Sequence, residues 1–187
     1  MTNLTSRSTS FARALRRLYL IRFAFAIVWG ALMFVVPATS GVVLTALLVI
    51  YPLFDAGAVL WQIRAQRSTS TSAVSSWVNV AVSVAIAIAL GVASVLSLAA
   101  ALAIWGIWAI GSGVPQLITA IRNRRSGGQV AQMLSGGISV LAGAAFTFQG
   151  LSGAENISGA GGYAVLGGIF FLISAIRLSL VARKKVA

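Results

Sequence analysis

The sequence predicts an all-α, polytopic membrane protein with six transmembrane helices arranged as three repeated helical hairpins. Of its 187 residues, 59% are hydrophobic and only 9% are charged, whereas a soluble domain carries about 25% charged residues. Six apolar runs of 19 to 25 residues occur along the chain, and a helix needs about 20 residues to cross the hydrocarbon core. The basic residues gather in alternate connections between these runs, which is typical of a membrane protein.

Each apolar run is continuous rather than alternating, which favours a membrane helix over a barrel strand. The runs cover residues 18–36, 41–63, 75–93, 97–121, 129–149 and 159–181.

We therefore predict a single membrane domain over residues 1–187. Its parts are an N-terminal segment at 1–17, hairpins at about 18–64, 75–122 and 129–181, and a tail at 182–187.

The basic residues predict the orientation of the chain. All 14 Lys and Arg residues lie before or near the start of the first run, or near the end of or after the second, fourth and sixth runs. The connections near 37–40, 94–96 and 150–158 contain none. The positive-inside rule then places both termini in the cytoplasm, in a multi-pass protein of the plasma (inner) membrane. The net charge of +12 is accounted for by anionic lipid headgroups, so we expect membrane lipids as partners and no nucleic acid.

The composition also excludes most enzyme chemistry. The chain has no His and no Cys, and only two acidic residues. It lacks the usual metal ligands, the usual general base and the thiol nucleophile. We expect no catalytic residue, no metal and no cofactor, because no nucleophile–base pair can be assembled.

The N-terminal segment is basic and amphipathic. In FARALRRL (11–18), apolar residues share one helical face and the arginines lie mostly on the other, which predicts a short interfacial helix. An Arg-rich start before an apolar run also allows a cleavable signal peptide, although this run is long for one.

An internal repeat is visible at the ends of the even-numbered runs. They close with LWQIR, ITAIR and ISAIR, so that Arg64, Arg122 and Arg177 lie 58 and 55 positions apart. This period of about 55 residues predicts a helical hairpin that occurs three times.

Small residues recur every four positions in the odd-numbered runs and in the sixth. Between helices in lipid, such spacing allows the close backbone approach that drives association. We expect the first, third and fifth runs to pack at the centre of the bundle, while a homo-oligomer formed through the same faces stays open. The stripes are Ala26-xxx-Gly30, Ser83-xxx-Ala87-xxx-Gly91, Ser135-xxx-Ser139-xxx-Gly143 and Ala160-xxx-Ala164-xxx-Gly168.

The first hairpin carries a resemblance to a known family. It has Gly30, then Pro37 at the end of the first helix, a Ser40-Gly41 start to the next helix, and Gly57 late in that helix. With three repeats and basic inner connections, it resembles the HdeD family of acid-resistance membrane proteins. The second and third hairpins lack the proline. The resemblance implies a small bacterial inner-membrane protein linked to survival in acid or other stress, with no mechanism attached.

Asp55 is the only aspartate, and it lies in an apolar run. It lies nine positions before Arg64, which places it roughly 13 Å from the helix end. A charge at that depth costs about 2.5–3.5 kcal/mol, so Asp55 should pair with a cation, accept hydrogen bonds or bind a proton. Arg22, one turn inside the antiparallel first run, is the predicted partner; the alternative is that its side chain extends to the headgroups.

The remaining polar residues carry weaker signals. We expect interhelical hydrogen bonds from Asn79 and Gln149, helix kinks near Pro52 and beside Gln116, and a solvated Glu155. The three tryptophans at 77, 105 and 108 are expected to pack or to anchor at the interface.

The sequence therefore favours a non-enzymatic, HdeD-like membrane protein that contributes to acid or envelope stress tolerance. The alternative is a small transporter or channel with Asp55 as a proton- or ion-interacting group, for which the sequence offers few groups to line a polar path. A scaffold that binds another membrane protein through its small-residue faces is the third class.

Overall fold

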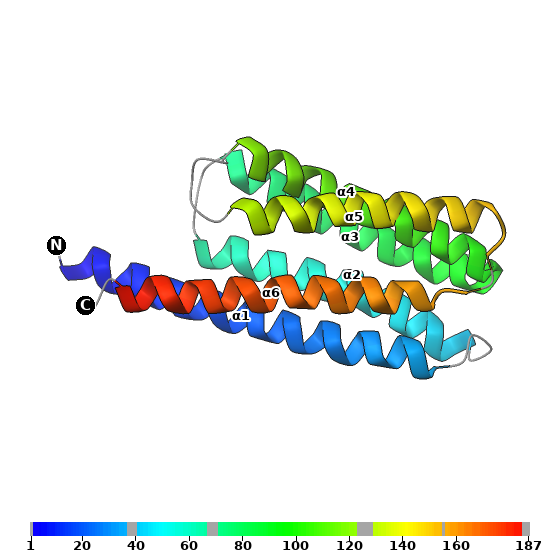
Figure 1. The fold of residues 1–187 in the computed structure, drawn as a ribbon, viewed down its shortest axis with the longest axis horizontal. Coiled ribbons are helices and arrows are strands. Elements are labelled where there is room, and N and C mark those ends of the chain that lie inside the picture. Colours follow the sequence, from blue (N-terminus) through cyan, green and yellow to red (C-terminus); the bar gives the residue numbers. More distant parts are fainter. Residues whose placement is uncertain (1, 37–40, 67–70, 123–128, 155, 185–187) are drawn as a thin grey trace.

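The computed structural model describes residues 2–36, 41–66, 71–122, 129–154 and 156–184, and their regular structure is entirely helical. Each of the six helices contains a span long and apolar enough to cross a membrane, so the predicted all-α class with six membrane-length helices is confirmed (Figure 1). The arrangement as three repeated hairpins stays a prediction. The helices are α1 (Thr2–Val35), α2 (Gly41–Gln66), α3 (Thr71–Leu96), α4 (Leu98–Arg122), α5 (Gln129–Leu151) and α6 (Ser158–Lys184).

The N-terminal residues do not form a separate interfacial helix. Instead, α1 runs without interruption from Thr2 to Val35. The chain has no Gly or Pro between residues 2 and 29, so nothing in that stretch opposes continuation of the helix.

The end of α5 and the junction between α3 and α4 have local causes. Gly153 has a φ of 79°, and the amide of Ala154 donates to the carbonyl of Gln149 while that of Gly153 donates to Gly150. This Schellman arrangement ends α5. Ser97 alone separates α3 from α4, and its hydroxyl accepts a hydrogen bond from the amide of Ala100 at 3.0 Å, as an N-cap does.

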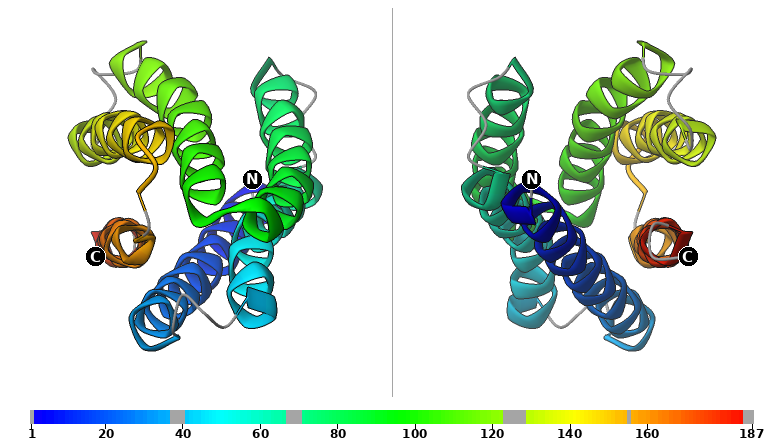
Figure 2. Two further views of the ribbon diagram at one scale, coloured as in Figure 1. Left: turned by 90° about the vertical axis from the view of Figure 1, so that its right-hand side faces the viewer. Right: turned by 90° about the vertical axis from the view of Figure 1, so that its left-hand side faces the viewer.

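The helices form a ring in chain order, with α6 closing against α1 (Figure 2). The closest pairs are α1 with α6, α2 with α3 and α4 with α5, while α1–α2, α3–α4 and α5–α6 pack more loosely. Among the described residues, two odd-numbered helices never form a packed pair. The expectation that α1, α3 and α5 meet at the centre is therefore wrong, and each of them packs on an even-numbered helix instead.

The glycines explain which helices approach most closely. A Cβ atom built on Gly143 of α5 would lie 2.6 Å from the carbonyl oxygen of Gly106 on α4, and one on Gly30 of α1 would lie 2.9 Å from that of Gly161 on α6. Only glycine allows such backbone contact. The other two predicted packing glycines are in looser contact, Gly91 with Val49 and Gly168 with Ala26.

Both termini lie at one end of the bundle (Figure 1). Because α2, α4 and α6 run toward this end, Arg64, Arg122 and Arg177 lie near it as well. We call it the basic end.

Candidate functional site

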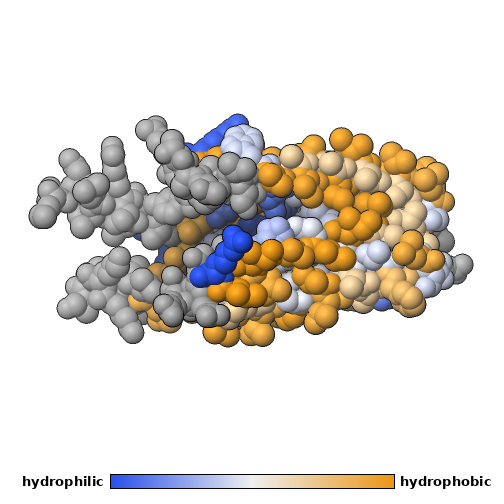
Figure 3. All heavy atoms as spheres, turned by 90° about the horizontal axis from the view of Figure 1, so that it is seen from above, coloured by the Kyte–Doolittle hydropathy of each residue, from blue (hydrophilic) through white to orange (hydrophobic). Residues whose placement is uncertain are grey.

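A cavity of about 920 Å³ lies inside the ring, lined by residues of all six helices. Its lining extends from Tyr51 and Trp108, in the middle of α2 and α4, to Gln62, Ser76 and Ala120 near the basic end. On one side, α3 and α4 diverge toward the basic end (Figure 2). Figure 3 shows a hollow on that side, with hydrophilic residues along its floor and hydrophobic residues around it.

Polar side chains on facing helices converge on this cavity. They recur at the same spacing on α3 and α5, three and then four positions apart, so each set occupies one helical face. We call these two sets the polar stripes, Ser76, Asn79 and Ser83 on α3 and Gln132, Ser135 and Ser139 on α5.

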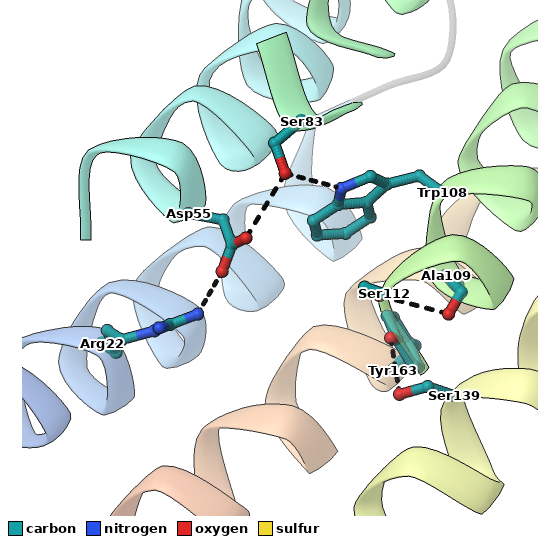
Figure 4. A network of polar contacts seen from close by, with 8 residues as sticks. All are labelled: Arg22, Asp55, Ser83, Trp108, Ala109, Ser112, Ser139 and Tyr163. Carbon is teal, nitrogen blue, oxygen red and sulfur yellow. Dashed lines mark hydrogen bonds and ion pairs between the residues drawn. The ribbon is translucent and has the colours of Figure 1, made fainter. Parts of the chain in front are cut away.

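An ion pair lies in the cavity wall between α1 and α2. The Arg22 guanidinium donates a hydrogen bond to the Asp55 carboxylate, and their side chains are only 12% and 14% exposed. The same guanidinium lies over the ring of Phe171, 4.1 Å from its centroid. The second carboxylate oxygen accepts from the Ser83 hydroxyl at 3.4 Å, and that hydroxyl accepts from Trp108 Nε1 at 3.3 Å (Figure 4). The predicted partners are thus brought together, within a network that reaches α3 and α4.

A second group of hydrogen bonds lies across the cavity. The Tyr163 hydroxyl of α6 donates to Ser139 of α5 at 2.9 Å, close to Ser112 of α4 (Figure 4). Gln116 of α4 donates to the side-chain oxygen of Gln132 on α5 at 2.8 Å. These bonds join α5, which the ion-pair network does not reach, to α4 and α6, so polar contacts involve all six helices around the cavity.

Asn79 differs from the other polar residues of the lining. Its side-chain oxygen is buried and accepts no hydrogen bond from any described residue. This oxygen therefore does not form the interhelical hydrogen bond that was predicted for Asn79. A buried, unpaired acceptor is costly unless water or a ligand satisfies it, and Asn79 lines the cavity.

Aromatic residues close the cavity on the side away from the basic end. Trp29 and Trp105 stack with ring centroids 5.0 Å apart, and Tyr51 packs against Trp29 at 4.6 Å and Trp108 at 5.6 Å. Trp29 and Trp105 are buried, and Trp29 Nε1 donates to the carbonyl of Leu47 at 2.7 Å. We call Trp29, Tyr51, Trp105 and Trp108 the aromatic plug. Beyond it lie apolar residues such as Leu44, Leu48, Leu102 and Phe146.

The other predicted residues lie apart from the cavity or have structural roles. Pro52 and Pro115 are contained within α2 and α4. Trp77 and Gln149 are exposed, and Glu155 is outside the described residues. Trp105 and Trp108 pack in the core, as expected of structural tryptophans.

Most of the residues that line the cavity were not predicted from the sequence. The small-residue spacing assigns Ser83, Ser135 and Ser139 to packing stripes, whereas all three line the cavity. Ser139 does both, since its Cβ lies 2.7 Å from where Gly113 would carry one. The spacing of the polar stripes was the available signal.

Comparison with known proteins adds a family match to part of the chain. Residues 78–148, from α3 through most of α5, match the family described as a short repeat of unknown function (DUF308). Searches of curated proteins and of solved structures found no match. Together with the six apolar spans, this match is consistent with an integral membrane protein, one part of which is similar to that repeat.

Proposed function

We propose that this protein binds a small amphipathic solute in its central cavity and belongs to the transporter or channel class, with no enzymatic activity. The observation that supports this most is the convergence of polar groups from six helices on one cavity of about 920 Å³. Intramembrane polar and charged groups that face a cavity mark solute or ion pathways in membrane proteins. This was the alternative reading of the sequence, and the polar lining removes the main argument against it.

The lining favours a solute that is neither purely polar nor purely apolar. Hydroxyl and amide groups alternate with aromatic rings, among them Phe25, Phe54 and Phe170. Pockets for small molecules combine apolar and aromatic walls with a few placed polar groups, and they measure about 300–1,000 Å³. The unpaired oxygen of Asn79 is the acceptor that we expect to contact a solute donor.

The Arg22–Asp55 pair is the group that we expect to respond to the solute. Because the two charges neutralise each other, the pair leaves no net charge on the wall. A charged ligand group would compete with one partner, and a separated pair would change how α1 and α2 pack. Asp55 would then be the proton- or ion-interacting group.

We propose that this activity takes place in the bacterial inner membrane and contributes to acid or envelope stress tolerance. This role is supported by the resemblance of the first hairpin to the HdeD family, whereas the DUF308 match lies at residues 78–148 and is to a repeat of unknown function. It is tested by acid-challenge survival of a deletion strain that carries either the intact protein or Asp55→Asn at matched membrane levels. Rescue by the intact protein alone supports the role and involves the carboxylate, whereas failure of both proteins removes the stress assignment.

The cavity itself is tested by thiol labelling, because the chain has no native cysteine. Ser135→Cys places a thiol in the cavity lining, and Leu141→Cys places one on the same helix at a side chain that is 73% exposed to the surrounding lipid. In membrane fragments open to the reagent from both faces, a charged, membrane-impermeant thiol reagent should label the first and spare the second. Equal protection of both would mean that water does not enter the cavity, and the solute-binding proposal would fail.

A further inference from the structure

A second concavity lies on the outside of the bundle, in the groove between α1 and α2 near the basic end. It has a volume of about 640 Å³ and is lined largely by apolar residues, including Leu18, Ile21 and Trp61. Its room comes from the small residue Gly57, where an added Cβ would meet nothing within 4 Å. The spans that form it are Arg13–Val35 and Gly41–Ala65, so in a bilayer the groove faces acyl chains.

Two arginines lie at the mouth of this groove. Arg13 and Arg17 both line it, and their four-residue separation puts them one above the other on α1. Among the described residues no side-chain carboxylate is available to them, because Asp55, the single acidic residue described, is paired with Arg22. Arg16, between them, donates instead to Ser179 of α6.

We propose that this groove binds one anionic phospholipid, with the phosphate between Arg13 and Arg17 and an acyl chain against Leu18, Ile21 and Gly57. Basic pockets between membrane helices on the cytoplasmic side bind anionic headgroups, and guanidinium groups suit phosphate oxygens. Trp61 lies at the level where indole rings anchor at the headgroup boundary. The site is separate from the central cavity, although Phe54 lines both.

The test is native mass spectrometry of the purified full chain with phosphatidylglycerol as the probe. The intact protein should retain one phosphatidylglycerol and release phosphatidylcholine. Arg13→Gln with Arg17→Gln should weaken retention roughly 30-fold, since each surface arginine contributes about fivefold toward anionic lipid. Gly57→Phe should also abolish retention while keeping both charges. Because nothing lies near Gly57, this variant should fold normally, which circular dichroism checks.

Two controls distinguish a specific lipid site from a general attraction of anionic lipid to the basic end. Arg122→Gln removes a positive charge at the same end, away from the groove, and should retain the lipid. An equal loss in Arg122→Gln, or unchanged retention in Gly57→Phe, would overturn the proposal. Glycerol 3-phosphate, which has the headgroup phosphate without acyl chains, should not compete; effective competition would mean that the arginines bind a free phosphate and the groove holds no lipid.

Discussion

Arg22 of α1 and Asp55 of α2 form an ion pair in the cavity wall, with side chains 12% and 14% exposed. Each charge also has a second contact, Arg22 with the Phe171 ring and Asp55 with the Ser83 hydroxyl. The pair therefore links α1 and α2, which otherwise pack loosely, to α3 and α6. Its position makes it both a packing element and the charged feature of the site.

Breaking this pair should destabilise the protein. Asp55→Asn leaves the Arg22 charge without its carboxylate, and removing one partner of a buried pair costs about 3–5 kcal/mol. We expect the lower end of that range, because water in the cavity can hydrate the guanidinium. Unfolding of the purified protein in detergent measures the change.

The double variant Arg22→Gln/Asp55→Asn separates pairing from general disruption. If the two residues interact, the combined cost falls below the sum of the single costs, with a coupling of about 0.5–3 kcal/mol. Arg64→Gln, at the exposed end of α2, is the control and should stay within about 0.5 kcal/mol of the parent protein. Strict additivity of the two single variants would show that the pair does not stabilise the fold.

The glycine contacts predict that Gly→Ala has opposite effects on protein stability at two positions of α5. Gly143→Ala forces a methyl group to 2.6 Å from the carbonyl oxygen of Gly106, whereas at Gly137 an added Cβ meets nothing within 4 Å. Overpacking costs about 1–3 kcal/mol, while Gly→Ala in an open helical position gains up to about 1 kcal/mol. Detergent unfolding should show Gly143→Ala destabilised and Gly137→Ala unchanged or stabilised. If both variants are stabilised, α4 and α5 do not approach as closely as the structure shows.

The helices and the ion pair were accessible from the sequence for clear physical reasons. The length of each span follows from membrane thickness, and the depth of Arg22 and Asp55 follows from counting residues along antiparallel helices. The choice of helix neighbours was not accessible, because small-residue stripes show that a face packs closely but not against which partner. The hydrogen-bond partners of the serines were not predictable for a related reason. Ser112 and Ser174 donate to backbone carbonyls of their own helices, whereas Ser83 and Ser139 join other helices, and a serine considered on its own does not distinguish the two cases.

The orientation predicted by the basic residues can be measured with the same thiol chemistry. Ser152→Cys lies in the exposed turn after α5, and Ala65→Cys lies at the exposed basic end of α2. The positive-inside rule predicts that an impermeant reagent labels Ser152→Cys in right-side-out vesicles and Ala65→Cys only in inverted vesicles. The reverse pattern would place the termini outside and would move the cavity mouth to the other face of the membrane.

The aromatic plug predicts where a pathway through the bundle is closed. Trp105 is fully buried and stacked on Trp29, and its indole nitrogen has no hydrogen-bond partner among the described residues. Trp105→Ala removes one of the two fully buried indole rings between the polar cavity and the apolar end. It should lower stability by about 3–5 kcal/mol and raise proton leakage in proteoliposomes, measured with a trapped pH-sensitive dye.

Trp77→Ala, at an exposed position on α3, is the matched control and should leak no more than the parent protein. Asp55→Asn in the Trp105→Ala background distinguishes the routes, because leakage through the cavity passes the ion pair and should change with it. If Trp105→Ala stays folded by circular dichroism and leaks no more than the parent protein, the plug is structural and the cavity is a closed binding pocket rather than half of a pathway.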